Sequence, residues 1–447
     1  MRLVPSVRLA VAWTVVGVPA LAIGHAVPSA APIAMLAVAA LVSLALADAA
    51  LGLRAFDGVT AVLQPVTAMR KGIATTLDVT LMRAGAWRVA VAFPSEFDHD
   101  ATPVDAAATS DGRASVAQLP VTPTARGRFA IDEVHVQSPT PLGLWEARTA
   151  LPVDGEIRVH PDLATERRAA VFIDRGPAGS HARRVIGKGR EFEKLRDYQP
   201  GDGYDEIHWK ATARRGKPVT KVFQVERTRR VHVVIDASRL SGRPAREPTA
   251  ATGATRPATV LERYVSAAMI LAEAAGRQDD LFGLMTFSDT VHRAMPAGHG
   301  PRHQAACRDA LLGLAPRMVA PDFDELFARV RMGIRSRSLI VVLTCLDDPA
   351  VSESFLRGLE AVRGRHLLVV ASIAPAGARA VFDPAADPVN SSTDLYGRLA
   401  GQLQWSDRRL VAAELARRGV RVLDLDELRL GAQLVAEYAG LKARQAL

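Results

Sequence analysis

The stretch VHVVIDAS at residues 231–238 decides the fold of the C-terminal half, because a run of apolar, mostly β-branched residues ends there in an acid and a hydroxyl. Such a run is typical of a strand buried on both faces of a parallel sheet. Its alternation with helical patterns predicts a doubly wound α/β domain with helices on both faces. Further strands are expected at 280–288, 338–348, 366–373 and 421–427, and helices at about 258–276, 302–314, 323–333, 351–363, 406–418 and 427–443.

Oxygen-bearing side chains follow two of these expected strands. Asp236 and Ser238 end the first, and Asp347 and Asp348 end the run at 338–348. Ligands of open parallel sheets bind beyond the carboxyl ends of the strands. Hard oxygen ligands suit Mg²⁺ or Mn²⁺, so the sequence predicts a candidate site for Mg or Mn at this edge of the sheet.

Upstream of this domain, the N-terminus reads as a transmembrane helical hairpin. Residues 9–27 and 32–53 are apolar apart from His25 and Asp48, and each run is long enough to cross a bilayer. Basic residues flank both outer ends and are missing from the short turn, so the positive-inside rule places both termini and the soluble domains in the cytoplasm. Asp48 is expected to snorkel or to pair with Arg54.

A β-rich section follows the hairpin. Short alternating runs separated by Pro and Gly predict an antiparallel, β-sandwich-like domain without a catalytic constellation. Its strands are expected at 75–82, 87–93, 128–136, 144–149 and 156–161, with a loop at 98–114. The division predicted from sequence is a hairpin at 1–58, a sandwich at 59–165, a basic-aromatic segment at 166–228 and the α/β domain at 229–447.

The block at 187–227 is the most distinctive segment, since it mixes both charge signs with aromatic residues. One interpretation is a recognition surface, and the other is an internal ion-pair network that locks the block onto the next domain. In either case Arg196, Lys210 and Arg214 would pair with acids, which in the second case are Glu191, Asp202 and Glu206.

Composition excludes several classes of protein. Two cysteines, Cys307 and Cys345, rule out a disulfide scaffold and a four-thiolate zinc site. The dinucleotide fingerprint, the phosphate loop and the common hydrolase motifs are missing. A net charge of +9 permits binding to nucleic acid, anionic lipid or acidic protein and selects none of them.

The segment GREFEKLRDYQPGDGYDEIHWKATAR at 189–214, followed by VHVVIDAS, resembles the bacterial "domain of unknown function 58" family. The segment ARGRFAIDEVHVQSPTPLGLWE at 125–146, RVHP at 158–161 and the twin N-terminal spans agree with this family. The motif residues carried over, as partner-binding or structural positions, are Glu191, Phe192, Leu195, Arg196, Tyr198, Gly201, Asp202, Ile207, Trp209, Lys210, Thr212, Ala213 and Arg214.

The resemblance implies a von Willebrand factor A-like domain at about 229–447, with a metal-ion-dependent adhesion site that binds an acidic residue of a partner. It also implies location in the bacterial inner membrane and a MoxR-type AAA+ ATPase partner in protein assembly or maturation. Asp236, Ser238, Ser241, Asp322 and Asp347 are the metal ligands so implied, with Asp348 and Asp324 as alternates.

This sequence departs from the family pattern at several positions. Leu240 occupies the second Ser position of the adhesion motif, and Asp322 or Asp324 stands where the family has Thr. Asp205, His208 and Thr140 also replace the usual residues. The first loop carries an insert, 242–257, with the composition of a flexible loop. A degenerate site whose polar groups cap helices is therefore the alternative to a bound metal.

Three functions compete. The first is a non-enzymatic, membrane-anchored interaction or scaffold protein that binds a cytoplasmic partner. The second is a metal-dependent hydrolase that uses the strand-end acids with His208 or His232 as base. The third, which is least favoured, is a nucleic-acid-binding surface at 183–230. The missing catalytic motifs favour the first.

Overall fold

The computed structural model describes residues 2–110, 112–174, 186–199, 204, 207–224, 229–248, 255–375, 377–383 and 391–444, without the side chains of 171–174, 186–196 and 221–224. The chain forms two compact units, Met1–Asp162 and Leu163–Leu447.

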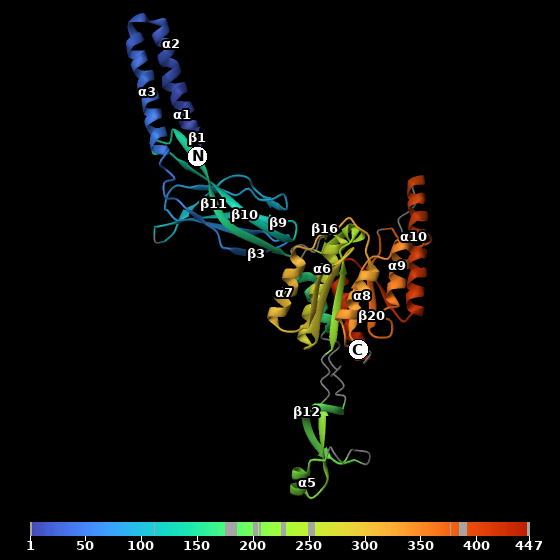
Figure 1. Cartoon of the computed structure of the whole chain (residues 1–447). Coiled ribbons are helices and arrows are strands. Elements are labelled where there is room, and N and C mark those ends of the chain that lie inside the picture. The colour runs from blue at the N-terminus through green and yellow to red at the C-terminus, as the bar shows by residue number, and fades with distance from the viewer. Residues whose placement is uncertain are drawn as a thin grey trace. The chain divides into compact units, whose positions relative to one another are not determined.

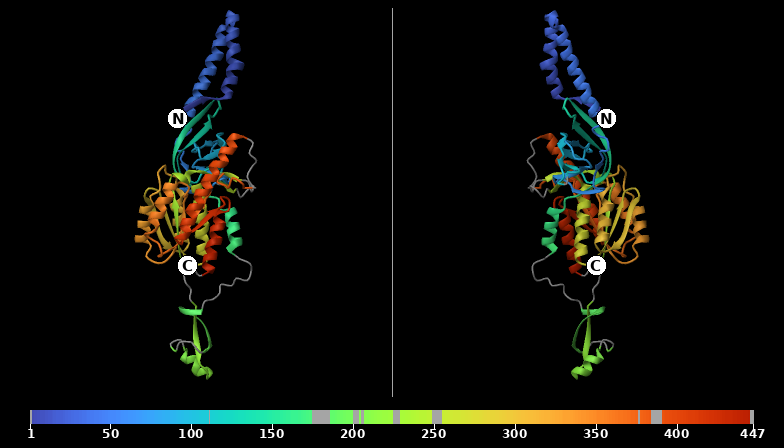
Figure 2. Two further views of the ribbon diagram at one scale, coloured as in Figure 1. Left: turned by 90° about the vertical axis from the view of Figure 1, so that its right-hand side faces the viewer. Right: turned by 90° about the vertical axis from the view of Figure 1, so that its left-hand side faces the viewer.

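Two apolar helical segments open the first unit and confirm the expected hairpin. Val7–Ala26 is 20 residues long and Pro28–Gly52 is 25, so both are long and apolar enough to cross a membrane. They run side by side in every view (Figures 1 and 2). Their elements are α1 (Val7–Ala12), a π-helical turn (Trp13–Gly17), α2 (Val18–Ala26), a 3₁₀ turn (Pro28–Ala30) and α3 (Ala31–Gly52).

The end of α3 is joined to the sandwich by Asp48, so the expectation that this carboxylate snorkels or pairs with Arg54 is wrong. Asp48 is fully buried. Its Oδ1 accepts a hydrogen bond from the Leu142 N–H at 2.9 Å, and its Oδ2 accepts from the Leu144 N–H at 3.0 Å and from the Thr140 hydroxyl. The carboxylate therefore accepts hydrogen bonds from the turn that joins β10 to β11. These bonds offset the cost of burying its charge, which exposure to lipid would not do.

Two sheets pack face to face in the first unit and confirm the expected sandwich-like domain. One has the order β1-β11-β10-β5-β7, with β3 parallel to β11, and the other has the order β2-β4-β9-β6, with β8 beside β9. Their strands are β1 (Arg2–Pro5), β2 (Ala61–Val62), β3 (Val66–Arg70), β4 (Thr75–Leu81), β5 (Arg88–Ala90), β6 (Phe97–His99), β7 (Val104–Asp105), β8 (Ala107–Ala108), β9 (Ser115–Pro123), β10 (Gly127–Pro139) and β11 (Trp145–His160). The two runs expected as separate strands at 144–149 and 156–161 form one strand, β11, and the loop at 98–114 contains three short strands.

A six-stranded sheet, β18-β17-β14-β19-β20-β21, forms the centre of the second unit. All its pairs are parallel except the edge pair of β17 and β18, so the doubly wound expectation is confirmed. The strands are β14 (Arg230–Asp236), β17 (Leu281–Phe287), β18 (Val291–Gly298), β19 (Leu339–Leu343), β20 (Leu367–Ile373) and β21 (Arg421–Leu425).

Alternate residues of each central strand enter two separate cores. In β14, Val231, Val233 and Ile235 pack with the helices of one face, whereas Val234 packs with those of the other. The first face is covered by α6 (Val260–Arg277), α7 (Pro301–Leu312) and α11 (Leu430–Ala443), and the second by α8 (Phe323–Gly333), α9 (Pro349–Leu359) and α10 (Ser392–Arg417). Figure 1 shows the sheet between these layers.

Three regions of this unit differ from the sequence-based expectation. The insert at 242–257 contains a two-stranded antiparallel ribbon, β15 (Pro244–Pro248) and β16 (Thr255–Thr259), where a flexible loop was expected. Helix α10 begins 14 residues before the expected start at 406. Helix α4 (Ala164–Asp174) packs against α6 and α11, with Glu166 paired to Arg263, and so lies with the α/β domain.

The basic-aromatic segment has a small structure of its own. It comprises β12 (Ile186–Asp197), α5 (Trp209–Arg215) and β13 (Val219–Gln224), and β12 pairs with β13 in antiparallel register. His208 caps α5 by accepting from the Ala211 N–H at 3.1 Å, and Gly216 ends it at a φ of 67°.

Candidate functional site

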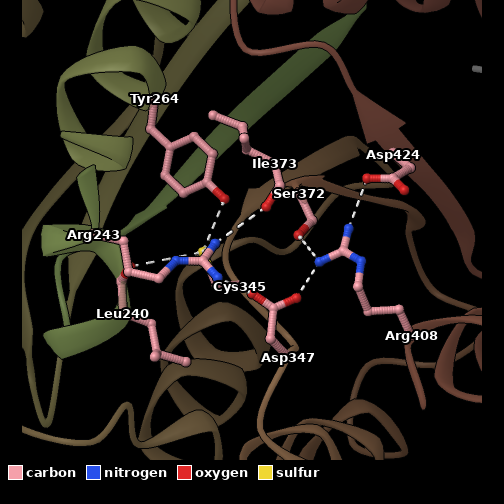
Figure 3. Close-up of polar contacts among 9 residues, drawn as sticks. All are labelled: Leu240, Arg243, Tyr264, Cys345, Asp347, Ser372, Ile373, Arg408 and Asp424. Atoms are coloured by element: carbon pink, nitrogen blue, oxygen red, sulfur yellow. Dashed lines mark hydrogen bonds and ion pairs between the residues drawn. The ribbon is translucent and has the colours of Figure 1, made fainter. Parts of the chain in front are cut away.

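Four charged side chains meet beyond the carboxyl ends of β14, β19, β20 and β21, and we call Arg243, Asp347, Arg408 and Asp424 the strand-end cluster. Arg243 Nη1 donates to Asp347 Oδ2, and Arg408 Nη1 donates to Asp347 Oδ1. Arg408 Nη2 then reaches Asp424 Oδ1 at 2.6 Å. Figure 3 shows the two guanidinium groups directed at the single Asp347 carboxylate. Both oxygens of Asp347 are therefore engaged by cations of the protein itself.

Elements outside the central sheet position Arg243 and Arg408 at the strand-end cluster. Arg243 immediately precedes β15, so the ribbon and the 3₁₀ turn Arg239–Gly242 hold its backbone beside the sheet edge. Arg408 lies on α10, on the side of the helix that also presents the buried Leu415. Two elements outside the sheet thus supply the cations, and the acids come from β21 and from the loop that follows β19.

Arg243 makes further contacts that fix its position. Its Nη2 donates to the Ile373 carbonyl at 3.1 Å and contacts Cys345 Sγ at 3.3 Å. The Tyr264 hydroxyl approaches the same sulfur at 3.4 Å. Burial raises the pKa of Cys345 to about 11, so this cysteine is a thiol near neutral pH and acts as a packed core group.

The first predicted ligands, Asp236 and Ser238, lie next to this cluster but are engaged by neighbours. Asp236 is buried, its Oδ1 accepts from the Ser238 N–H at 2.8 Å, and its Oδ2 accepts from the Thr344 hydroxyl at 2.6 Å. Burial raises the pKa of Asp236, and these hydrogen bonds oppose the rise only in part. The Ser241 hydroxyl donates to the Ser238 carbonyl at 2.7 Å, so it stabilises the loop.

Two of the three remaining predicted acids, Asp322 and Asp348, cap helices. Asp322 accepts from the Glu325 N–H at 3.0 Å and begins α8. Asp348 accepts from the Ala350 N–H at 3.0 Å, begins α9 and pairs with Arg239 at 2.7 Å. Asp324 lies in the first turn of α8, within 3.5 Å of Arg357. An acid at the start of a helix is stabilised by the unpaired N–H groups and the dipole there.

The arrangement does not fit a divalent cation. One observation would suit a ligand, since the buried Ser238 hydroxyl has no hydrogen-bond partner in the described part of the chain. Against it, both oxygens of Asp347, the third-loop acid of the predicted site, are neutralised by guanidinium groups of the chain. Within the described ranges no three His, Cys, Asp or Glu side chains gather as a metal site. Binding of Mg or Mn stays a prediction.

Neither candidate base for a hydrolase lies in this cluster. His208 is the N-cap of α5 in the basic-aromatic segment. His232 lies within β14, four residues before Asp236, and is almost fully buried. Burial lowers the pKa of His232 to about 4, so it is neutral and enclosed near pH 7. Neither of the two histidines named from the sequence is therefore placed to act as a base at the strand-end cluster.

The basic-aromatic segment presents an exposed aromatic next to a small core. Trp209 is 67% exposed and Ile207 is 7% exposed, and Thr212 Oγ1 accepts from the Val219 N–H at 3.0 Å. Tyr198 is half-buried, and Lys210, Ala213 and Arg214 are exposed. Gly201, Asp202 and Glu206, and the side chains of Glu191, Phe192, Leu195 and Arg196, lie outside the described residues.

Sequence reasoning missed Arg243 and Arg408, which are the residues that define the cluster. Their signal was indirect, because it requires knowing that Asp347 is largely buried and therefore needs a cation as partner. The cations come from an insert and from a helix 61 residues downstream of Asp347. Nothing in the local sequence pattern connects them.

Residues 194–380 match the family described as protein of unknown function DUF58, which confirms the resemblance found in the sequence. No curated protein matches the chain. Among solved structures, an aerotolerance-related membrane protein from Bacteroides fragilis is 12% identical, with a TM-score of 0.29, over 48% of this chain and 99% of that one.

Two further solved structures are similar. BatB from Bacteroides thetaiotaomicron is 10% identical, with a TM-score of 0.29, over 48% of this chain and 99% of that one. The SpRpn10 VWA domain is 10% identical, with a TM-score of 0.27, over 46% of this chain and 94% of that one. The assignment of the C-terminal fold rests on its own strand order and helix layers.

Proposed function

From the DUF58 region at 194–380, we propose that this chain is a membrane-anchored, non-enzymatic interaction protein whose C-terminal domain binds a cytoplasmic protein partner at the carboxyl ends of its strands. The apolar hairpin would hold the domain at the inner membrane, with both termini in the cytoplasm. The partner we propose is a MoxR-type AAA+ ATPase, acting in the assembly or maturation of other proteins. That partner rests on the family resemblance alone.

One observation carries this proposal. Asp347, the acid that a hydrolase or a metal-dependent adhesion site would need free, is bound on both oxygens by Arg243 and Arg408. A carboxylate held in this way is poorly available as a base or as a metal ligand. What it can support is a rigid, charge-balanced platform, and rigid platforms favour binding because little ordering is needed on association.

The accessible part of this platform is its rim. Arg239 and Asp348 pair at 2.7 Å with side chains 47% and 31% exposed, and the Asp424 side chain is 62% exposed. Rim charges of opposite sign steer and orient a partner that carries the complementary pattern. We therefore place partner recognition at Arg239, Asp348 and Asp424.

The test is crosslinking in the native cell followed by affinity capture of the tagged, full-length chain. The variant Arg239→Glu reverses one rim charge. The matched control is Arg331→Glu, an exposed arginine at the C-terminal end of α8. We expect an AAA+ ATPase to be captured by wild type and control, and to be lost with Arg239→Glu.

Two other outcomes would count against parts of the proposal. Equal capture by all three proteins would move docking away from the strand ends, to the basic-aromatic segment around Trp209. Capture without any AAA+ ATPase would reject the proposed partner. The variant Asp236→Asn, which keeps hydrogen-bonding capacity and removes charge, would separate a metal requirement from the rim contacts.

A further inference from the structure

We propose that the outer face of the β1-β11-β10-β5 sheet binds a phosphate-bearing anion through Arg2 and Arg148. Three arginines lie in one row across these strands. Arg2 is directly opposite Arg148, Arg148 is opposite Gln137, and Gln137 is opposite Arg88. Residues directly opposite each other in antiparallel strands point to the same face of a sheet. The row therefore gathers positive charge on one surface of the sheet. This inference does not depend on the protein partner proposed for the C-terminal domain.

The pairing of Arg2 with Arg148 is unfavourable unless an anion is present. Like charges directly opposite each other destabilise a sheet. Glu146 relieves only part of this, because its carboxylate binds Arg88 at 2.5 Å and Arg148 at 3.0 Å. In the described part of the chain the Arg2 guanidinium makes no hydrogen bond or ion pair. Of the three arginines, Arg88 and Arg148 thus contact Glu146, and Arg88 also lies opposite Asp105 at the far end of the row.

A cavity of about 570 Å³ lies over this row. Its polar lining is Arg2, Arg148, His135, Gln137 and Thr149, and its apolar lining includes Ala90 and Pro103. The Gln137 side chain is largely buried, and its amide has no hydrogen-bond partner within the ranges that the structure describes. Unused donors around a cavity of this size are typical of a small-ligand site.

The donors select the ligand class. Guanidinium forks match phosphate oxygens in bidentate geometry, and the Gln137 amide can supply a further N–H. His135 would add positive charge only when protonated, and it lies 3.6 Å from Glu133. A phosphate with a small apolar body therefore fits both parts of the lining.

Two sources share this chemistry, namely an anionic phospholipid headgroup and a soluble phosphate ester. The first is available because β1 leads directly into the apolar helices: Ser6 follows it, caps α1 and donates to the Gly143 carbonyl at 2.6 Å. Basic residues next to membrane helices attract anionic headgroups. The experiment below distinguishes the two sources.

The probe is the melting temperature of the purified full-length chain in neutral detergent at constant ionic strength. Three arms are compared: micelles doped with phosphatidylglycerol, micelles doped with phosphatidylcholine, and glycerol 3-phosphate without added lipid. At about ten times Kd we expect a rise of about 3–6 °C. A rise with phosphatidylglycerol alone identifies a headgroup site, and a rise with glycerol 3-phosphate identifies a soluble ligand.

For the variant Arg2→Gln we expect one effect on the melting temperature without ligand and another on the rise that the ligand causes. Without ligand its melting temperature should equal or exceed that of wild type, because a like-charge pair is removed. With ligand the rise should disappear. The matched control, Arg54→Gln, removes one exposed positive charge beyond the other end of the hairpin and should keep the rise.

Three results would overturn the proposal. One is a wild-type protein whose melting temperature rises in no phosphate arm or rises equally with phosphatidylcholine. Another is an Arg2→Gln variant that keeps the full rise. The third is a ligand-free Arg2→Gln variant that melts well below wild type, since Arg2 would then be paired within the protein.

Discussion

The Arg243 guanidinium binds Asp347 Oδ2, while Arg408 binds the other oxygen of the same carboxylate. This relationship fixes what the strand ends of the C-terminal domain can do. A site that the sequence marks for a divalent cation is instead held together by two cations of the chain.

Arg243→Met should destabilise the protein by about 2–4 kcal/mol, because it leaves a largely buried Asp347 half-neutralised and the Ile373 carbonyl without its guanidinium donor. Arg239→Met is the matched control, since Arg239 pairs with the adjacent acid, Asp348, in an exposed setting. It should cost less than about 1 kcal/mol. Chemical denaturation of the full-length protein in detergent measures both, and equal losses would contradict the account.

Asp48→Ala should loosen the junction between α3 and the sandwich. It removes the acceptor of the Leu142 and Leu144 N–H groups, and leaving the buried Leu144 donor unpaired costs about 1–3 kcal/mol. The readout is limited proteolysis near Trp145 together with the unfolding free energy. Asp78→Ala, at an exposed position of β4, is the control and should cost little. Cleavage at the wild-type rate would show that the junction does not depend on Asp48.

The stability of the C-terminal domain should fall as pH decreases from about 6.5 toward 4. His232 is buried, and its pKa is lowered from 6.5 to about 4, so the folded state favours the neutral ring. The stability that comes from keeping this ring neutral is therefore complete above pH 6.5. It is lost as the pH falls from 6.5 toward 4, because in this range His232 binds a proton more readily in the unfolded chain than in the folded one. It is worth about 3 kcal/mol at most. Urea denaturation across this pH range should show a shallower slope for His232→Gln, and an unchanged slope would assign the dependence to other groups.

Alanine substitution of Ile207 and of Trp209, two apolar residues of the basic-aromatic segment, should lower stability by very different amounts. Ile207→Ala should lower the local stability of the segment by about 2–4 kcal/mol because the side chain is buried. Trp209→Ala should change stability by less than about 0.5 kcal/mol, because the ring is mostly exposed. Hydrogen exchange of β12 and β13 measures local stability in each variant. Strong destabilisation by Trp209→Ala would mean that the ring packs rather than binds.

The parts of the fold that the sequence predicted are those with strong, continuous apolar patterns. The buried run around Val233 places β14 at the centre of the sheet, because both of its faces must be covered. The two apolar spans were found in the same way, because each is an uninterrupted apolar run long enough to cross a bilayer core. The acids that follow β14 and β19 were expected at one edge of the sheet, because these two strands are parallel neighbours and end at the same edge.

The parts that escaped prediction depend on contacts between distant segments. Strand β11 was divided because Pro152 and Gly155 resemble a turn, yet the chain continues opposite β10 through a register shift. The first turns of α10 are exposed, so no buried stripe marks them. Arg243 was hidden in an insert that has a loop-like composition and forms a ribbon. Each requires knowledge of which segments meet in space.

Manganese binding tests the central claim most directly. Mn²⁺ would be titrated into the purified full-length protein and free ion followed by electron paramagnetic resonance, with Asp236→Asn alongside. If the strand-end cluster is held by Arg243 and Arg408, wild type and variant should give the same curve, without a tight one-to-one site. A stoichiometric site in wild type that Asp236→Asn abolishes would contradict the account, because the cation would then bind despite the two arginines.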